Sequence, residues 1–295
     1  MWNARKWQLC CDRNAFPVIV SGMTLAPESL RGKTFVVTGA NQGIGFQAAH
    51  AFAQAGADLV LVCRSREKAE PAQAALAKFG TSVRLVLADV SLKAEVRRAC
   101  AEILASTPRI DVLLNNAGVL ATSRRDTSEG HEQTFATNHL GYYGMALGLL
   151  PCLREQRGAR IVNVASMAHV GALVDWDDLE LRKGFSPWRA YSNSKLFNIL
   201  FTRELAKRTE GMGVTVNSLH PGVVATGFAK TDGGVTALLA RLAAPFLTKA
   251  EDGAKTSIHL CTAPTVAAVS GRYFANCRET TPRRLARDDQ AAARL

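Results

Sequence analysis

Hydrophobic and polar positions follow two spacings that alternate along most of the chain. Short runs of apolar, often β-branched residues are typical of strands buried on both faces. Between them, longer segments carry apolar residues every three to four positions, which is typical of helices. The expected strands are 33–38, 58–63, 83–88, 111–114, 160–165, 214–219 and 271–274. The expected helices are 43–55, 65–79, 91–106, 129–157 (bent near Gly141 and Gly144), 187–209, 235–243 and 250–262.

This alternation predicts an α/β fold, a single-domain Rossmann-type doubly wound parallel sheet of about seven strands with helices on both faces. Right-handed crossovers would place the carboxyl ends of the strands at one edge of the sheet, where a ligand crevice forms. We expect the domain to span 23–278. A disordered extension would precede it over 1–22, and a loose polar tail would follow over 279–295.

Composition narrows the function classes. The chain is 47% apolar and 21% charged, with a formal net charge of +11. No run of Lys and Arg is dense enough to predict a nucleic-acid partner, and no apolar run reaches the ~20 residues that a membrane span needs. The seven scattered cysteines and six histidines show no metal-ligand spacing. We therefore expect reduced thiols in a cytoplasmic protein without a metal site, and treat all the histidines as non-catalytic.

A glycine-rich turn, Thr-Gly-Ala-Asn-Gln-Gly-Ile-Gly at 38–45, joins the first strand to the first helix. Such a turn, with the N–H groups and positive dipole end of the helix, predicts a cradle for a pyrophosphate. Its spacing differs from the commoner G-x-G-x-x-G, and a turn without a ligand is the alternative. The candidate cofactor-binding residues here are Gly39, Asn41, Gly43, Ile44 and Gly45.

Residues after the next strands would complete a dinucleotide site. Arg64 stands where an acid would bind ribose hydroxyls, which favours NADP over NAD, unless Arg64 is only a surface residue. Asp89 could accept a hydrogen bond from an adenine amino group, with Val90 against the ring, or Asp89 or Ser91 could cap the following helix. The fourth expected strand ends in small residues, Asn116, Ala117 and Gly118. Such residues permit a cofactor to approach closely, and the alternative is that they only form a turn.

Tyr191 and Lys195 lie four residues apart on an expected helix, so they share one face. A phenol is a poor base because its pKa is near 10. An adjacent ammonium favours the phenolate, which could exchange a proton with a carbonyl or alcohol oxygen during hydride transfer. A surface pair of this spacing is the alternative.

Two further polar residues are candidates for the same chemistry. Ser166 ends a strand, so its hydroxyl could polarise a substrate oxygen, or could only shape a turn. Asn138 lies inside a long helix, where a buried amide could bend the helix or hold a water, or could be an ordinary satisfied polar group.

Taken in order, these motifs resemble the short-chain dehydrogenase/reductase family over about residues 31–275. The resemblance is closest to the retinol dehydrogenase-like branch. The stretches 137–141, 200–208 and 220–224 carry it, together with the long gap from Ser166 to Tyr191.

The resemblance implies roles for individual residues. Tyr191 would be the general acid/base, Lys195 would lower its pKa and bind ribose, and Ser166 would orient the carbonyl. Asn138 would support a water of the proton relay, and Arg64 would select NADP. The residues that would bound the nicotinamide are Pro221, Gly222 and Thr226.

The expected activity is therefore that of an NADP-preferring oxidoreductase acting on a carbonyl/alcohol pair. Trp176, Phe185, Trp188 and the apolar stretch 238–247 favour an apolar substrate, retinol/retinal-like or another aldehyde or ketone. Ordinary loop packing explains those aromatic residues equally well. The chain could form a homo-oligomer. The alternatives are a nucleotide-binding regulatory or scaffolding protein without turnover, and a C=C reductase of the protochlorophyllide type.

Overall fold

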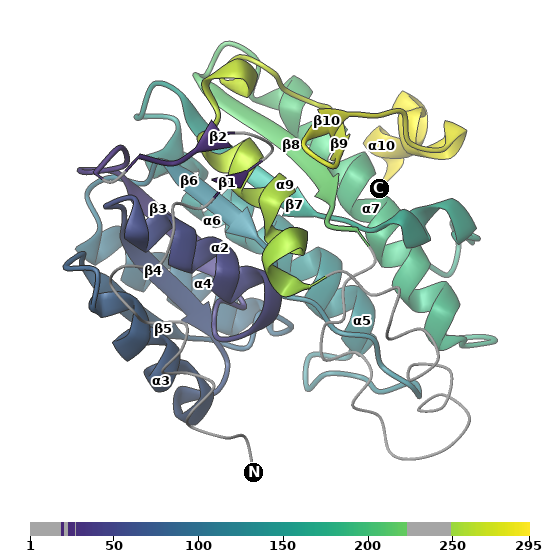
Figure 1. Cartoon of the computed structure of the whole chain (residues 1–295). Coiled ribbons are helices and arrows are strands. Elements are labelled where there is room, and N and C mark those ends of the chain that lie inside the picture. The colour runs from purple at the N-terminus through teal and green to yellow at the C-terminus, as the bar shows by residue number, and fades with distance from the viewer. Residues whose placement is uncertain (1–18, 21–22, 27, 223–248) are drawn as a thin grey trace.

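A twisted sheet forms the centre of the computed structural model, which describes residues 19–20, 23–26, 28–222 and 249–295 (Figure 1). Among these residues the sheet has eight strands in the order β10-β9-β8-β7-β6-β3-β4-β5. Every neighbouring pair from β9 to β5 is parallel, and only β10 runs antiparallel, against β9. The strands are β3 (Thr34–Thr38), β4 (Asp58–Cys63), β5 (Val83–Leu87), β6 (Val112–Asn115), β7 (Ala159–Val164), β8 (Val214–His220), β9 (Tyr273–Ala275) and β10 (Arg278–Glu279).

Helices cover both faces of this sheet. The described helices are α2 (Gly43–Gln54), α3 (Arg66–Ala77), α4 (Lys93–Ser106), α5 (Gln133–Phe135), α6 (Gly141–Leu153), α7 (Pro187–Arg208), α9 (Ala250–Thr262) and α10 (Asp289–Arg294), of which α5 and α10 pack against α7. Short 3-10 turns are η2 (Met167–Gly171), η5 (Pro264–Val266) and η6 (Arg284–Arg287). Figure 1 shows α2 and α9 crossing one face of the sheet.

Alternate residues of β3 show why the strands are apolar throughout. Phe35 and Val37 pack in a cluster with α2, α3 and α9, while Val36 packs on the other face with α4, α6 and α7. A strand covered on both sides needs apolar residues at successive positions. The doubly wound fold is therefore confirmed, with all seven expected strands and β10 as an eighth.

The strand order reverses direction at β3. From β3 the chain moves outward through β4 and β5, then returns to place β6 on the other side of β3. Ligands of open α/β sheets bind beside such a switch point, at the carboxyl ends of the strands. The ends of β3 and β6 therefore mark the expected crevice.

The expected bend in the helix 129–157 is present. α5 passes into a single π-helical turn, η1 (Ala136–Leu140), before α6 begins at Gly141. A Cβ at Gly141 would lie 2.6 Å from the carbonyl oxygen of Val90, so the glycine allows the helix to approach the loop after β5. Asn138 lies inside the π-turn.

The C-terminal tail was expected to be loose, and this expectation is wrong. Residues 278–295 form β10, η6 and α10, and Ala286, Ala291 and Ala292 are buried in a cluster with α7. Asp289 also pairs with Arg203 at 2.6 Å. Three alanines on one side of a polar segment are enough to dock it, although its composition hides them.

Two other expectations fall largely outside the described residues. Of the extension 1–22, only β1 (Ile19–Val20) is described, and it pairs antiparallel with β2 (Met23–Thr24). The expected helix 235–243 lies in the undescribed range 223–248.

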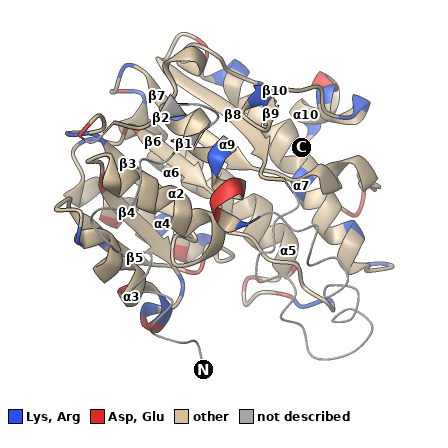
Figure 2. Ribbon diagram, viewed as in Figure 1, with Lys and Arg blue, Asp and Glu red and all other residues tan. Residues whose placement is uncertain are grey.

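Within the described ranges, none of the helices is both long and apolar enough to cross a membrane. Lys and Arg positions are scattered over several elements and are mixed with Asp and Glu positions (Figure 2).

Candidate active site

The glycine turn is held by side chains from the end of β6. The N–H groups of Asn116 and Ala117 donate to Thr38 Oγ1 at 2.9 and 3.0 Å, and Asn116 Nδ2 donates to the Thr38 carbonyl at 3.0 Å. Gly39 has a φ of +66°, and a Cβ there would lie 2.9 Å from Ala117 Cα. A Cβ at Gly45 would collide with Asn116 Nδ2. The Asn116 side chain therefore fixes the backbone of the glycine turn.

The start of α2 is suited to an anion. Its N-cap, Gln42, makes no side-chain capping hydrogen bond, and no acidic residue lies in its first turn. The first N–H groups of a helix need partners from outside the helix. Gly43, at a φ of +58°, brings this end close to the turn. The half-buried Asn41 lies beside it, whereas Ile44 is buried in the core. The turn therefore fits a pyrophosphate.

Arg64 and Asp89 contact each other at the ends of β4 and β5. Arg64 Nη1 lies 3.4 Å from Asp89 Oδ2, and the Arg64 side chain is 68% exposed. Burial raises the pKa of Asp89, but hydrogen bonds from Ser91 and the Arg64 charge outweigh it and give a net lowering. Arg64 therefore keeps free N–H groups for a phosphate, although part of its charge is already balanced.

Neither Asp89 nor Ser91 caps α4, so that alternative is wrong. Asp89 Oδ1 instead accepts from the Ser91 N–H and hydroxyl at 3.0 and 2.7 Å, in a local turn. Glu129, distant in sequence, accepts from the N–H groups of Lys93 and Ala94 at 2.7 and 2.9 Å. Val90, only 8% exposed, packs behind this turn.

Lys195 is buried beside Tyr191 on α7. Its side-chain nitrogen Nζ donates to the carbonyl oxygen of Val164, the last residue of β7, at 3.1 Å. It lies 5.6 Å from the ring centroids of both Tyr191 and Tyr142. The surface-pair alternative is therefore wrong: Lys195 is 3% exposed and points toward the sheet edge.

Burial has opposite effects on the two groups. It raises the pKa of Tyr191, and a hydrogen bond from Ser166 lowers that pKa in part. It lowers the pKa of Lys195 to about 7. Burial therefore sets the net direction of the Tyr191 pKa shift, which is opposite to the lowering by Lys195 that the sequence predicted. Tyr191 is therefore protonated at neutral pH.

Asn138 links the Tyr-Lys helix to the loop after β6. Its Nδ2 donates to the Val119 carbonyl at 2.9 Å and to Ser194 Oγ at 3.0 Å, and its Oδ1 accepts from the Val119 N–H at 2.8 Å. Both side-chain N–H bonds are therefore used. A water could be held only by the second lone pair of Oδ1 or by a backbone carbonyl of the π-turn.

Gly118 brings the two halves of the site together. A Cβ at Gly118 would lie 3.4 Å from Asn138 Oδ1 and 3.6 Å from Lys195 Nζ. The segment that holds the glycine turn through Asn116 therefore continues directly past the lysine. The glycine turn and the Tyr191–Lys195 pair therefore lie in one region at the carboxyl edge of the sheet.

Ser166 and Pro221 follow the adjacent strands β7 and β8. The two strand ends are joined by a hydrogen bond of 2.7 Å from the Ala165 N–H to the Leu219 carbonyl. Ser166 is the N-cap of η2. Gly222 has a φ of +85°. Thr226, expected beside the nicotinamide, lies outside the described residues.

Sequence reasoning missed several residues that shape the site. They are Glu129, Tyr142, His169 and Ser194. Each acts through a contact with a distant segment, for which the local pattern carries no signal. Trp176 was a candidate for substrate contact, but its ring packs against the core and under Arg294, 5.1 Å from the guanidinium.

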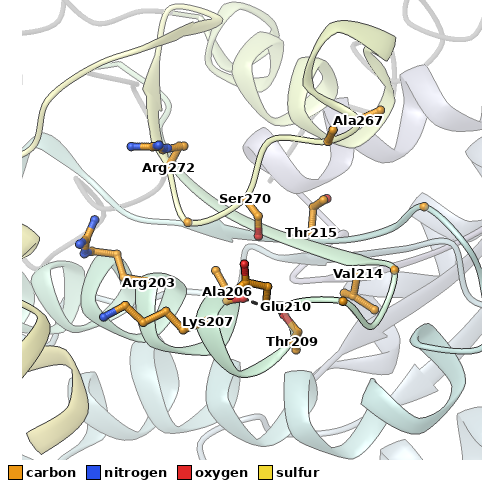
Figure 3. A pocket seen from close by; sticks show the side chains of 15 residues that line it. Arg203, Ala206, Lys207, Thr209, Glu210, Val214, Thr215, Ala267, Ser270 and Arg272 are labelled. Atoms are coloured by element: carbon orange, nitrogen blue, oxygen red, sulfur yellow. Dashed lines mark hydrogen bonds between the residues drawn. The ribbon is translucent and has the colours of Figure 1, made fainter.

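A pocket of about 650 Å³ lies at the opposite edge of the sheet (Figure 3). It is lined by Arg203 and Lys207 from the end of α7, by Glu210 just after that helix, and by Val214 and Thr215 from the start of β8. Lys207 is about 18 Å from Lys195 along the helix axis, at 1.5 Å per residue. The pocket is therefore separate from the candidate site.

Comparison with known proteins shows the family. A family model described as short chain dehydrogenase matches residues 33–233. The chain is 38% identical to retinol dehydrogenase 14 of Mus musculus over 286 residues, covering 91% of this chain and 85% of that protein. It is 39% identical to retinol dehydrogenase 12 of Homo sapiens over 269 residues, covering 90% and 84%.

A solved structure shares the fold. L-Sorbose reductase from Gluconobacter frateurii, complexed with NADPH and L-sorbose, superposes with a TM-score of 0.68 and 25% identity. The match covers 84% of this chain and 96% of that one. The chain therefore belongs to the short-chain dehydrogenase/reductase family, oxidoreductases that use nicotinamide cofactors, and within it to the retinol dehydrogenase-like branch.

Proposed function

We propose that this protein is an NADP-preferring oxidoreductase that interconverts an apolar aldehyde or ketone and its alcohol. One observation carries the proposal: Gly118 lies beside Lys195 and Asn138 and directly follows Ala117, which contacts the glycine turn at Gly39. When bound, the cofactor would supply or accept the hydride at the carbonyl carbon. The chain's own residues would supply or accept the proton at the oxygen.

The residues present fit such a cofactor. The free end of α2 would bind the pyrophosphate, with Gly39, Gly43 and Gly45 allowing close approach. Lys195 would hold ribose hydroxyls, and Pro221 and Gly222 would bound the nicotinamide. Arg64 would pair with a 2′-phosphate. The NADPH complex of the related sorbose reductase supports this choice of cofactor.

Tyr191 is proposed as the general acid of the reduction. Because the phenol is protonated at neutral pH, it has a proton to donate to the carbonyl oxygen. Ser166, hydrogen-bonded to Tyr191, would orient that oxygen. A charged Lys195 would then stabilise the phenolate, and Asn138 would support a water that returns the proton.

Apolar side chains beside Ser166 and Tyr191 favour an apolar substrate. Met167, Val170, Leu173 and Trp188 are 53%, 58%, 67% and 57% exposed. The first three lie on the segment after Ser166. A Cβ at Gly171 would lie 3.3 Å from the Trp188 indole nitrogen, so this segment packs against Trp188. The indole is 6.4 Å from the Tyr191 ring. The names of the two retinol dehydrogenases agree with this substrate class.

Trp188→Ser is expected to raise the KM for a long apolar aldehyde about tenfold, because the indole would no longer bury apolar substrate surface. The KM for a short aldehyde and the affinity for NADPH are expected to change little. Met212→Ser is the matched control, since Met212 is 43% exposed just beyond the far end of α7. Equal KM changes for the long and short aldehydes would remove Trp188 from the substrate surface.

Arg64→Asp is expected to shift the ratio of NADPH to NADH efficiency toward NADH by about tenfold to a hundredfold, since a hydrogen bond to a charged group contributes roughly 1.5–3 kcal/mol. The introduced carboxylate would also face Asp89 and repel a 2′-phosphate. The control is Arg66→Asp, because Arg66 pairs with Glu70 on α3 at 3.2 Å. A preference unchanged in Arg64→Asp, or changed equally in both variants, would rule out Arg64 as the selector.

A turnover screen tests the proposal as a whole. The protein would be assayed for reduction and oxidation of apolar aldehydes, ketones and alcohols, retinal included, with NADPH and NADH. Turnover of at least one carbonyl compound is expected, with NADPH preferred. Binding of NADPH without any turnover would favour a regulatory or scaffolding protein. Reduction of a ring C=C bond alone would favour a C=C reductase. The cytoplasmic location and a homo-oligomer stay predictions.

A further inference from the structure

His169 lies directly behind Ser166 and is 2% exposed. Its ring nitrogen Nδ1 is 2.7 Å from the Ser166 carbonyl oxygen, and its backbone N–H donates to the same oxygen at 3.1 Å. On the other side of the ring, Nε2 is 3.3 Å from the backbone N–H of Arg283. A carbonyl can only accept and an N–H can only donate. The contacts therefore require one neutral tautomer, with the proton on Nδ1.

Arg283 belongs to the C-terminal segment, and its side chain also contacts the η2 region. Its guanidinium Nη1 donates to the Ala172 carbonyl at 2.6 Å and lies 3.5 Å from the His169 carbonyl. Beyond Arg283 the segment continues into η6 and α10, which pack against α7. The same segment therefore contacts the turn that carries Ser166 and the helix that carries Tyr191.

A second histidine extends the arrangement to the neighbouring strand end. The His169 ring lies edge-on to Tyr273 of β9, with the ring centroids 5.1 Å apart. His220 also packs on Tyr273, with the centroids 6.5 Å apart and an angle of 23° between the rings. His220 Nδ1 accepts from the Gly222 N–H at 2.9 Å. The packing around Tyr273 thus supports both loops expected at the nicotinamide end of the site.

We infer that His169 is a positioning residue, which connects the C-terminal segment to Ser166 and fixes the serine for its contact with Tyr191. This inference rests on the proposed function. Ser166 Oγ accepts from the Ala168 N–H at 3.1 Å, and the serine makes its own hydrogen bond to Tyr191. The orientation of the Ser166 hydroxyl depends on the η2 turn. The hydrogen bond from His169 Nδ1–H to the Ser166 carbonyl holds this turn from the side-chain side.

Paired substitutions test this role. His169→Phe removes both ring hydrogen bonds, whereas His169→Asn keeps a donor at the position of Nδ1. His169→Phe is expected to lower kcat about tenfold to a hundredfold, as misplacement of a catalytic group does. His169→Asn should recover most of kcat, and neither should change the affinity for NADPH. His259→Phe is the matched control, since it removes a half-buried imidazole from α9.

A double-substitution cycle separates positioning from general structure. In a Ser166→Ala background, adding His169→Phe is expected to lower kcat no further, because the group that His169 positions is already gone. A full multiplicative loss in that background, or a His169→Asn variant as slow as His169→Phe, would overturn the inference. Either result with an active wild type would leave the proposed function standing.

A spectroscopic measurement keeps the inference testable without turnover. Imidazole 15N shifts of the full chain at pH 7 should show His169 protonated at Nδ1 and unprotonated at Nε2, and Arg283→Ala should perturb them. The opposite tautomer would overturn the inference. If the wild type reduced no substrate, the proposed function would fail, and the tautomer would still decide whether His169 holds Ser166.

Discussion

Tyr191→Phe is expected to lower kcat by about 10²- to 10⁴-fold, the range that a positioned general acid contributes. The substitution removes one oxygen from a half-buried ring and leaves its packing in place. Because the glycine turn and Lys195 are untouched, the affinity for NADPH should stay near the wild-type value. Steady-state kinetics with an apolar aldehyde, beside fluorescence titration of NADPH, measures both.

Tyr142→Phe provides the matched control. Tyr142 is buried and lies at the same 5.6 Å from Lys195 Nζ as Tyr191 does, but on α6. Its hydroxyl donates to the Val164 carbonyl at 3.4 Å, so a protein group already uses its proton. The control should keep most of its activity. Near-normal turnover in Tyr191→Phe, or equal losses in the two variants, would refute the acid/base role.

Lys195→Met is expected to abolish turnover and yet raise the stability of the protein. Burial lowers the pKa of Lys195 from 10.5 to about 7, so folding disfavours its charged form. Replacing buried ionic groups with well-packed apolar side chains of similar volume is often neutral or stabilises a protein by roughly 1–4 kcal/mol. The Val164 carbonyl would still accept from Tyr142 and Asn198. Thermal unfolding at several pH values measures the gain.

The gain in folding stability of Lys195→Met over the wild type should fall as the pH rises. Between pH 7 and 10.5 the unfolded chain binds more protons at this lysine than the folded chain, so the wild type gains stability as pH rises. The advantage of Lys195→Met is therefore largest below pH 7 and shrinks toward pH 10.5. Lys183→Met, at an exposed lysine, should show no such trend. A Lys195→Met variant less stable than the wild type at pH 6 would contradict the account.

The fold followed from the sequence because strands buried on both faces leave a strong pattern. Val36 and Phe35 face opposite sides of the sheet, and both had to be apolar. The glycine turn and the Tyr-Lys pair were also found, because their spacing along the chain is itself the geometry. Gly141 marked the bend in the helix before α6 for the same reason.

The remaining contacts join segments that are distant in sequence. Glu129 caps α4 from a separate loop, and Asp89 closes a local turn instead. Arg283 reaches His169 from more than a hundred positions away, in a tail whose composition suggested a loose end. Burial of Lys195, which decides its charge, depends on the complete fold around it.

Isotope transfer tests the central claim most directly. NADPH carrying deuterium at both C4 positions of the nicotinamide would be incubated with retinal or another apolar aldehyde that the protein turns over. The account predicts that the wild type and Tyr142→Phe form an alcohol one deuterium heavier. Tyr191→Phe should form almost no deuterated alcohol in the same time. Alcohol formed without deuterium, or deuterium transfer unaffected in Tyr191→Phe, would contradict it.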